Sequence, residues 1–292
     1  MTVKIVTYRA LEAGPTLTVL GAVHGNERCG AEAIRSLIAQ IDQGVVGVTR
    51  GTLQLVPVVN PRAYAEGVRF VERNLNRYLY PKEEKQYYED HLDPIVCGLL
   101  DATDVLLDLH SYASQGGPFI FVGTERGAEL AYARSLGVTD FVCGWSEAFG
   151  SGTGRESQGT TEYARTQGAL AVTLECGHHH NPDAAAVGYR GILRAMAHLE
   201  MLGAGDLPDA AQRASGAQRF VQMKSVYRRE AGAEFARPWQ HFDAVTKGEA
   251  MANLAGGGVL AAPEDGFIVL PKESADTGGE WFFFGTRMTL PA

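Results

Sequence analysis

The sequence predicts an α/β protein with a mixed, mostly parallel sheet flanked by helices, followed by a small C-terminal β-rich module. In the first two thirds of the 292 residues, short apolar, β-branched runs alternate with segments of helical periodicity. Beyond residue 217, short apolar runs are separated by Gly, Asp and Pro. Alternating strands and helices are typical of a sheet covered on both faces, whereas closely spaced short strands indicate a β-rich unit.

The expected strands of the first part are largely apolar on both faces, as strands of a buried parallel sheet are. They cover residues 3–8, 17–23, 53–59, 104–110, 118–123 and 170–175. A helix is expected after Glu27, where apolar residues recur on one helical face: Ala31, Ile34, Leu37, Ile38 and Ile41. A second helix is expected from Asn181 as N-cap, with Pro182 in its first turn and an apolar stripe through Ile192, Met196 and Leu199.

The change of texture predicts an α/β domain at 1–203, a linker at 204–217 and a β-rich module at 218–292. The linker segment is rich in small and polar residues. A glycine-rich stretch at 150–154 lacks the Gly-Lys-Ser/Thr of a phosphate loop, so it is expected to form a flap beside the active site.

Composition excludes several partners. The net charge is −8 and the basic residues are scattered, which argues against nucleic acid. No apolar run approaches the roughly 20 residues that cross a membrane, and the N-terminus lacks an export signal, so a cytoplasmic location is expected. The cysteines form no C-x-x-C pair and are expected to be free thiols. The sequence leaves homo-oligomerisation open.

Polar residues stand where several expected strands end. His24 and Glu27 follow the strand at 17–23, His110 ends the strand at 104–110, and Glu175 ends the strand at 170–175. Ligands of open α/β sheets gather at the carboxyl ends of the strands, so these side chains are expected to share one edge. Two imidazoles and a carboxylate with an open fourth position form the usual hydrolytic zinc site. His24, Glu27 and His110 are therefore the candidate zinc ligands, one ion per chain, and Glu175 is the candidate base.

Some neighbouring residues allow two readings. Asp108 lies two residues before His110 on the same strand face, so it could orient the imidazole or form a sheet-edge hydrogen bond. Gly25 is expected to let the backbone turn tightly between the two ligands. The run of His178, His179 and His180 is expected to hydrogen-bond locally rather than to bind metal.

The ordered motifs HGNE (24–27), NPRA (60–63), NLNR (74–77), DLH (108–110) and ECG (175–177) resemble the signature of the succinylglutamate desuccinylase/aspartoacylase family, a branch of the zinc carboxypeptidase superfamily. The resemblance implies a carboxypeptidase-like zinc hydrolase that cleaves the amide of a small N-acyl amino acid. It implies zinc at His24, Glu27 and His110, Glu175 as general acid/base, and Arg62 as the group that polarises the scissile carbonyl.

The resemblance also implies that Asn76 and Arg77 hold a substrate carboxylate, which a guanidinium fork suits. Arg69 and Arg73 are expected instead to form surface ion pairs with Glu66 and Glu72. For a second carboxylate no local motif decides between three residues, of which Arg155 is taken as the candidate: Arg155, Tyr163 and Arg165.

Many relatives have Asp where this chain has Asn74, and the change could alter how neighbouring groups are oriented. Two other functions stay open at this point. One is a metallocarboxypeptidase that trims short peptides, which a larger, open cleft would favour. The other is a metal-binding protein without turnover, such as a sensor or binding module, against which an intact Glu175 counts.

Overall fold

The computed structural model describes residues 2–124, 127–150, 155–203 and 217–289. The expected linker, apart from residue 217, and the expected flap, apart from Gly150, lie outside these ranges. Within them, none of the helices is long and apolar enough to cross a membrane. The four cysteines are buried and free, as expected.

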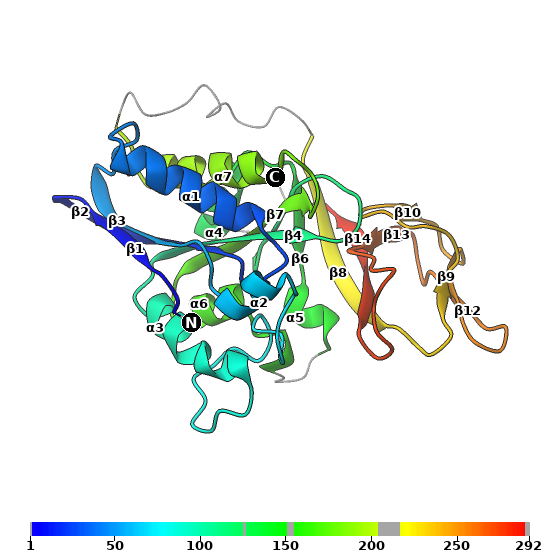
Figure 1. The fold of residues 1–292 in the computed structure, drawn as a ribbon. Coiled ribbons are helices and arrows are strands. Elements are labelled where there is room, and N and C mark those ends of the chain that lie inside the picture. Colours follow the sequence, from blue (N-terminus) through cyan, green and yellow to red (C-terminus); the bar gives the residue numbers. More distant parts are fainter. Residues whose placement is uncertain (1, 125–126, 151–154, 204–216, 290–292) are drawn as a thin grey trace.

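A mixed sheet runs through the molecule (Figure 1). In the described part it has eleven strands, in the order β1-β3-β2-β4-β7-β5-β6-β8-β14-β13-β10. β2 pairs in parallel with β3 and β4, and β4 pairs in parallel with β7. The first seven strands are β1 (Val6–Arg9), β2 (Glu12–Gly21), β3 (Arg50–Val56), β4 (Val105–Tyr112), β5 (Phe119–Phe121), β6 (Asp140–Cys143) and β7 (Leu170–His178).

Helices cover both faces of this sheet, as the alternating pattern predicted (Figure 1). One face packs against α1 (Cys29–Asp42), α4 (Gly127–Ser135) and α7 (Ala184–His198). The other packs against α3 (Asp93–Leu100) and α6 (Thr160–Thr166). Short elements lie between them: α2 (Pro61–Glu66), η1 (Tyr88–His91), α5 (Trp145–Ala148) and η2 (Arg155–Ser157).

The two hydrophobic cores explain why these segments form. Leu107 and Leu109 of β4 face the core that contains Ile34 and Leu37 of α1, whereas Leu106 faces the opposite core. Successive strand residues point to opposite faces, so a continuous apolar run buries both sides of the sheet. The resulting sheet is the mixed, helix-flanked one that the sequence predicted.

α7 begins later than the sequence predicted. Its first residue is Ala184 and its N-cap is Asp183. Asn181 Oδ1 accepts a hydrogen bond from the N–H of Asp183, 2.9 Å away. A bond from an Asn side chain to the backbone two residues on forms a turn of its own. Asn181 therefore turns the chain ahead of the helix instead of capping it.

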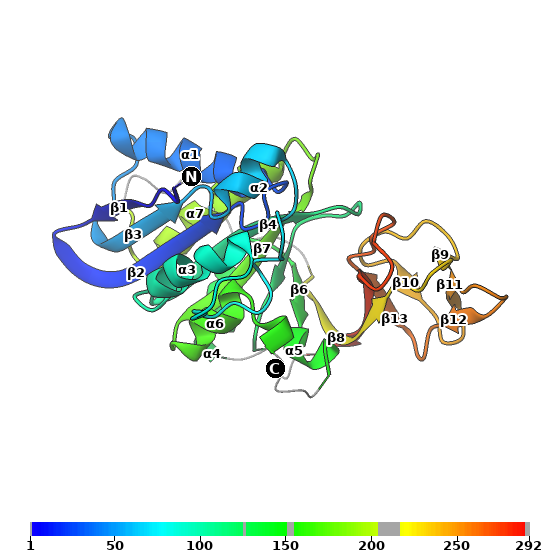
Figure 2. The ribbon, with the colours of Figure 1, turned by 60° about the horizontal axis from the view of Figure 1, so that its bottom comes forward.

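The C-terminal strands extend the central sheet and also build a lobe beside it (Figure 2). β8 pairs in parallel with β6 and antiparallel with β14, which leads to β13 and β10. A separate sheet has the order β12-β11-β9. These strands are β8 (Arg219–Arg228), β9 (Glu234–Phe235), β10 (Ala244–Val245), β11 (Ala250–Asn253), β12 (Val259–Ala261), β13 (Gly266–Val269) and β14 (Glu280–Met288).

The lobe has a core of its own, with Trp281, Phe282 and Phe284 buried among residues of β9 to β13. We propose that 218–292 is a module in this sense. The hydrogen bonds of the sheet nevertheless run without a break from β6 into β8. This continuous sheet attaches the module to the α/β body, so residues of the module can line the pocket described below.

Candidate metal centre and its pocket

Sheet register brings the strand-end residues together. β4 and β7 are parallel neighbours in which His110 lies directly opposite Glu175. On the other side of β4, Gly21 at the end of β2 lies opposite Leu109, so the chain carrying His24 and Glu27 leaves β2 beside His110. The candidate ligands and the candidate base therefore meet at one edge, as their position at strand ends predicted.

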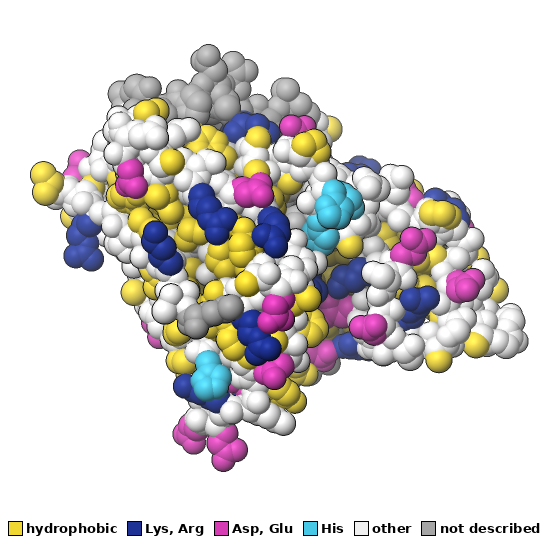
Figure 3. Space-filling model, viewed as in Figure 1, with side chains coloured by type: hydrophobic (Ala, Val, Ile, Leu, Met, Phe, Trp, Pro, Cys, Tyr) yellow, Lys and Arg dark blue, Asp and Glu magenta, His cyan; other side chains and the backbone are white. Residues whose placement is uncertain are grey.

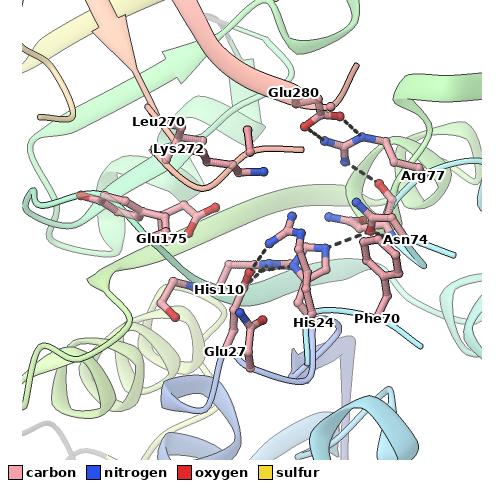
Figure 4. Close-up of a pocket in the computed structure, with 18 of the residues that line it drawn as sticks. His24, Glu27, Phe70, Asn74, Arg77, His110, Glu175, Leu270, Lys272 and Glu280 are labelled. Atoms are coloured by element: carbon pink, nitrogen blue, oxygen red, sulfur yellow. Dashed lines mark hydrogen bonds and ion pairs between the residues drawn. The ribbon is translucent and has the colours of Figure 1, made fainter. Parts of the chain in front are cut away.

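His24, Glu27 and His110 form a buried cluster whose ligand atoms all lie within 4.8 Å of one another. Glu27 stands between the two rings: its Oε1 lies 2.9 Å from His24 Nδ1 and its Oε2 lies 2.8 Å from His110 Nδ1. Figure 4 shows the three side chains converging from separate segments. Two imidazole nitrogens that face one carboxylate in this way could hold a single divalent ion.

The far nitrogen of each ring has an oxygen partner. His24 Nε2 lies 3.0 Å from Asn74 Oδ1, and His110 Nε2 lies 2.9 Å from Asp108 Oδ2. An oxygen acceptor there places the proton on Nε2 and leaves Nδ1 free to bind a metal. Of the two readings of Asp108, the structure supports the one in which it orients His110. Asn74 orients the His24 ring in the same way, through its neutral amide oxygen. An Asp at this position would offer a charged carboxylate oxygen to the same nitrogen.

The electrostatics of the cluster differ between its two rings. Burial, together with the positive charge of Arg69, lowers the pKa of His24 to about 3, so its ring is neutral. Burial alone would also lower the pKa of His110, but Asp108 and Glu27 raise it well above the ordinary value. His24 Nδ1 is buried and, despite its distance from Glu27, has no well-formed hydrogen bond to any described residue; the same holds for His110 Nε2 beside Asp108. A buried polar atom without a partner is costly, and a bound cation would satisfy it.

Gly25 is required for space rather than for an unusual turn. It is not among the glycines with positive φ. A Cβ atom at this position would lie 2.1 Å from the carbonyl carbon of Ala63 in α2. The N-terminal turn of α2 is itself fixed by Asn60, whose Oδ1 accepts the N–H of Ala63 at 3.2 Å. The NPRA motif thus builds a helix start that packs against the ligand loop.

Arg62 does not lie at the site. Its guanidinium bonds Glu66 at 2.8 Å on the surface, and it is absent from the residues that line the pocket. Arg69 lies there instead, with Nη1 2.7 Å from Glu27 Oε1. The expected surface pairs were therefore wrong: Arg69 pairs with Glu27, and Arg73 pairs with the buried carboxylates of Asp90 and Asp93. The loop at 67–73 turns back toward the ligands, which spacing along the chain does not reveal.

Asn76 and Arg77 do line the pocket, but each already has a partner. Asn76 Oδ1 accepts the N–H of Thr160 at 2.8 Å. Arg77 donates from Nε and Nη2 to the two carboxylate oxygens of Glu280, both at 2.9 Å, and its guanidinium lies over the ring of Trp145. The Glu280 partner comes from the first residue of β14, more than 200 residues further along the chain.

Arg155 lies outside the pocket. It is exposed, and its guanidinium lies over the ring of Tyr80, 4.1 Å from the ring centroid. The other two candidates for a second carboxylate, Tyr163 and Arg165, do not line the pocket either; they bond Asp101 and Glu129 respectively. The structure therefore leaves the second-carboxylate role without any of the three residues that the sequence suggested.

Glu175 faces the cluster across a pocket of about 580 Å³. It is buried, its Oε2 has no hydrogen-bond partner in the described residues, and Figure 4 shows it pointing into the space above the ligands. Burial raises the pKa of Glu175 to about 8, partly offset by His110. A carboxylate with a raised pKa is a stronger base, and therefore suited to accept and return a proton.

The C-terminal lobe supplies one wall of the pocket. Lys272, Glu280 and Phe283 line it together with residues of the larger body. Figure 3 shows acidic and basic side chains gathered in the cleft between body and lobe. Neither Lys272 nor Glu280 lies in a motif, so no local pattern in the sequence predicts that they line the pocket. Both reach the site because β13 and β14 are attached to the central sheet.

A profile of the succinylglutamate desuccinylase/aspartoacylase catalytic domain matches residues 13–199, which include the ligand cluster and Glu175. The chain belongs to this family. The match runs from β2 to the residue directly after α7. The resemblance drawn from the five short motifs is thereby confirmed.

Individual relatives and solved structures share only a small part of their sequence with this chain. A probable aspartoacylase from Nostoc sp. is 28% identical over 119 residues, which are 37% of this chain and 39% of that relative. A succinylglutamate desuccinylase/aspartoacylase from Rhodobacter sphaeroides has a TM-score of 0.76 at 20% identity, covering 98% of this chain and 89% of the other. The product-bound ectoine utilization protein EutE (DoeB) from Ruegeria pomeroyi has a TM-score of 0.72 at 21% identity, covering 97% and 88%. These structures support the fold.

Proposed function

We propose that this family member is a metal-dependent hydrolase that cleaves the amide bond of a small N-acyl amino acid. The observation that carries the proposal is the buried His24–Glu27–His110 cluster with Glu175 facing it across a pocket of about 580 Å³. The activities after which the family is named, those of aspartoacylase and succinylglutamate desuccinylase, are hydrolyses of this kind. Zn²⁺ suits the two-nitrogen, one-carboxylate donor set.

Each residue has a distinct part in the proposed reaction. His24, Glu27 and His110 would hold a divalent ion, which would supply Lewis-acid chemistry when bound. Glu175 accepts a proton from the attacking water and returns it to the amide nitrogen as the C–N bond breaks. Arg69, rather than Arg62, lies where its guanidinium can donate to the carbonyl oxygen as negative charge develops on it. Asn76 and Arg77 form the pocket wall that the substrate contacts.

The size of the pocket favours this function over trimming of peptides. A volume of about 580 Å³ falls in the range of small-molecule sites. The C-terminal lobe closes one side, with Lys272, Glu280 and Phe283 in the wall. The pocket accordingly suits a single N-acyl amino acid.

The proposal can be tested by metal analysis followed by amine-release assays on N-acetyl, N-succinyl and N-formyl amino acids. The Glu175→Gln variant should retain the metal and lose most turnover, because the amide cannot accept the proton. Glu84→Gln, at an exposed position, is the matched control and should behave as the wild type. Full hydrolysis by Glu175→Gln would remove Glu175 from the mechanism. Failure of the wild type on the whole panel would refute the proposed function.

A further inference from the structure

The pocket holds a cation that no carboxylate of the protein neutralises at close range. Five basic side chains line it, and four already form ion pairs: Arg69 with Glu27, Arg73 with Asp90 and Asp93, Arg77 with Glu280, and Arg228 with Glu156. The fifth is Lys272. Across the described residues, no carboxylate oxygen lies within 4.0 Å of its amine, and no hydrogen-bond acceptor contacts it.

The backbone fixes Lys272 so that its side chain enters the pocket. Its N–H donates to the carbonyl of Trp281 at 2.8 Å, which ties the loop after β13 to β14. Two residues earlier, Leu270 has a φ of 51°, an unusual conformation for a residue with a branched side chain, and its N–H bonds His241 Nδ1 at 3.1 Å. Strained backbone of this kind persists where the surroundings hold it in place. Figure 4 shows the Lys272 amine between the Arg77–Glu280 pair and the ligand cluster.

The charge of Lys272 is costly in the free protein. Burial lowers the pKa of Lys272 to about 8, with Arg69 and Arg77 acting in the same direction and Glu280 and Glu27 opposing them. The amine is therefore mostly protonated at neutral pH. A half-buried ammonium without a partner is unfavourable, and an incoming carboxylate would relieve that cost.

Arg77 is a less suitable anchor for a substrate carboxylate. The oxygens of Glu280 already occupy its Nε and Nη2 donors in a bidentate pair. An anion placed against the same guanidinium would face the Glu280 carboxylate at close range, and like charges there repel. The basic residues of the wall are also matched by five acidic ones: Glu27, Glu162, Glu175, Asp276 and Glu280.

From this arrangement we infer that Lys272 binds the carboxylate of the substrate, and that the Arg77–Glu280 pair makes the enzyme prefer substrates with one carboxylate over dicarboxylates. The inference deepens the proposed function and rests on it. It assigns Lys272 as a specificity-determining residue. It also predicts that this chain discriminates against the N-acyl derivatives of aspartate and glutamate.

Matched substrates test the charge preference. N-acetylasparagine and N-acetylaspartate have nearly the same shape and differ in one charge, as do N-acetylglutamine and N-acetylglutamate. The enzyme should hydrolyse N-acetylasparagine and N-acetylglutamine with a kcat/KM about 10-fold or more higher than that for N-acetylaspartate and N-acetylglutamate. The Glu280→Gln variant should narrow this ratio, because Arg77 then has an uncompensated charge. A higher kcat/KM of the wild type for N-acetylaspartate and N-acetylglutamate would overturn the proposed preference for substrates with one carboxylate.

A substitution tests the anchor. Lys272→Met keeps the length of the side chain and removes the charge, so KM for N-acetylasparagine should rise about 10- to 100-fold while kcat changes little. For an N-acetyl amino acid amide, which has no carboxylate, Lys272→Met and the wild type should have equal KM. Lys247→Met, at an exposed position of the same lobe, is the control. An unchanged KM, or the same loss with both substrates, contradicts the assignment.

Binding separates this inference from the proposed function. In the Glu175→Gln background the affinity for N-acetylasparagine can be measured by calorimetry without turnover. Adding Lys272→Met should weaken that affinity about 10-fold or more. Equal affinities, or no binding by the Glu175→Gln protein at millimolar ligand, overturn the role of Lys272. Lack of hydrolysis by the wild type with Lys272-dependent binding would refute only the proposed reaction.

Discussion

Glu89 is predicted to hold the loop that carries Arg69 to Arg77 in its active shape. Its side chain is fully buried and accepts four hydrogen bonds. Oε1 accepts from the N–H of Val71 at 2.7 Å and from Asn60 Nδ2 at 3.1 Å. Oε2 accepts from the N–H groups of Glu72 and Arg73 at 3.2 and 3.0 Å. All four neighbours are donors, so the site requires two acceptor oxygens.

Glu89→Gln keeps the shape and removes one acceptor. In either orientation the new NH₂ group points at two N–H donors, and Asn60 cannot turn its amide because its Oδ1 caps α2 through Ala63. A hydrogen bond to a charged group contributes about 1.5–3 kcal/mol, so losing two of them costs about 3–6 kcal/mol. Domains are typically stable by about 5–15 kcal/mol, so the variant should lose a large part of its stability.

Urea unfolding of the metal-free protein measures this loss directly, with the exposed Glu84→Gln as control. The loop holds Arg69 and Asn74 against the ligand cluster, so kcat/KM should fall as well at temperatures where the variant is still folded. A stability loss of less than about 1 kcal/mol would show that the four bonds do not matter as argued.

Three further predictions concern the site itself. Asn74→Ala should weaken metal affinity about 10- to 100-fold because His24 loses the acceptor that orients its ring, whereas Asn74→Asp should keep it; metal-buffer titration measures both, and equal affinities would contradict this role. Arg69→Ala should lower kcat/KM about 100-fold and Arg62→Ala should leave it almost unchanged; the reverse order in steady-state assays would restore Arg62 to the mechanism. In the metal-free protein, Glu175 holds its proton up to a pKa of about 8, whereas the unfolded chain releases it near 4.5, so stability should fall as pH rises between these values, by up to about 1.4 kcal/mol per pH unit. The stability of Glu175→Gln should lack this part of the pH dependence. Thermal unfolding with chelator from pH 5 to 8 measures both proteins, and the same pH dependence in the two would refute this role of Glu175.

Local patterns were sufficient to predict the body of the protein and the centre of its site. Short continuous apolar runs predicted the buried strands and apolar residues at a period of 3.6 predicted the flanking helices, because both patterns follow from backbone geometry. The candidate ligands and Glu175 were predicted for a related reason: each lies in the last part of a strand or in the loop that follows it, and parallel strands in register end at one edge. The C-terminal β character was also predictable, but its junction with β6 was not.

The tertiary structure decided which charged groups face one another. Arg69, not Arg62, forms an ion pair with Glu27, and Arg77 forms one with Glu280. Lys272, from the C-terminal part of the chain, lines the same pocket. No local period relates residues separated by 40 to 200 positions, so the sequence could propose arginines for the site but could not pair them. The path of the 67–73 loop and the attachment of β14 to the sheet determine these pairs, and with them the charge that a substrate meets.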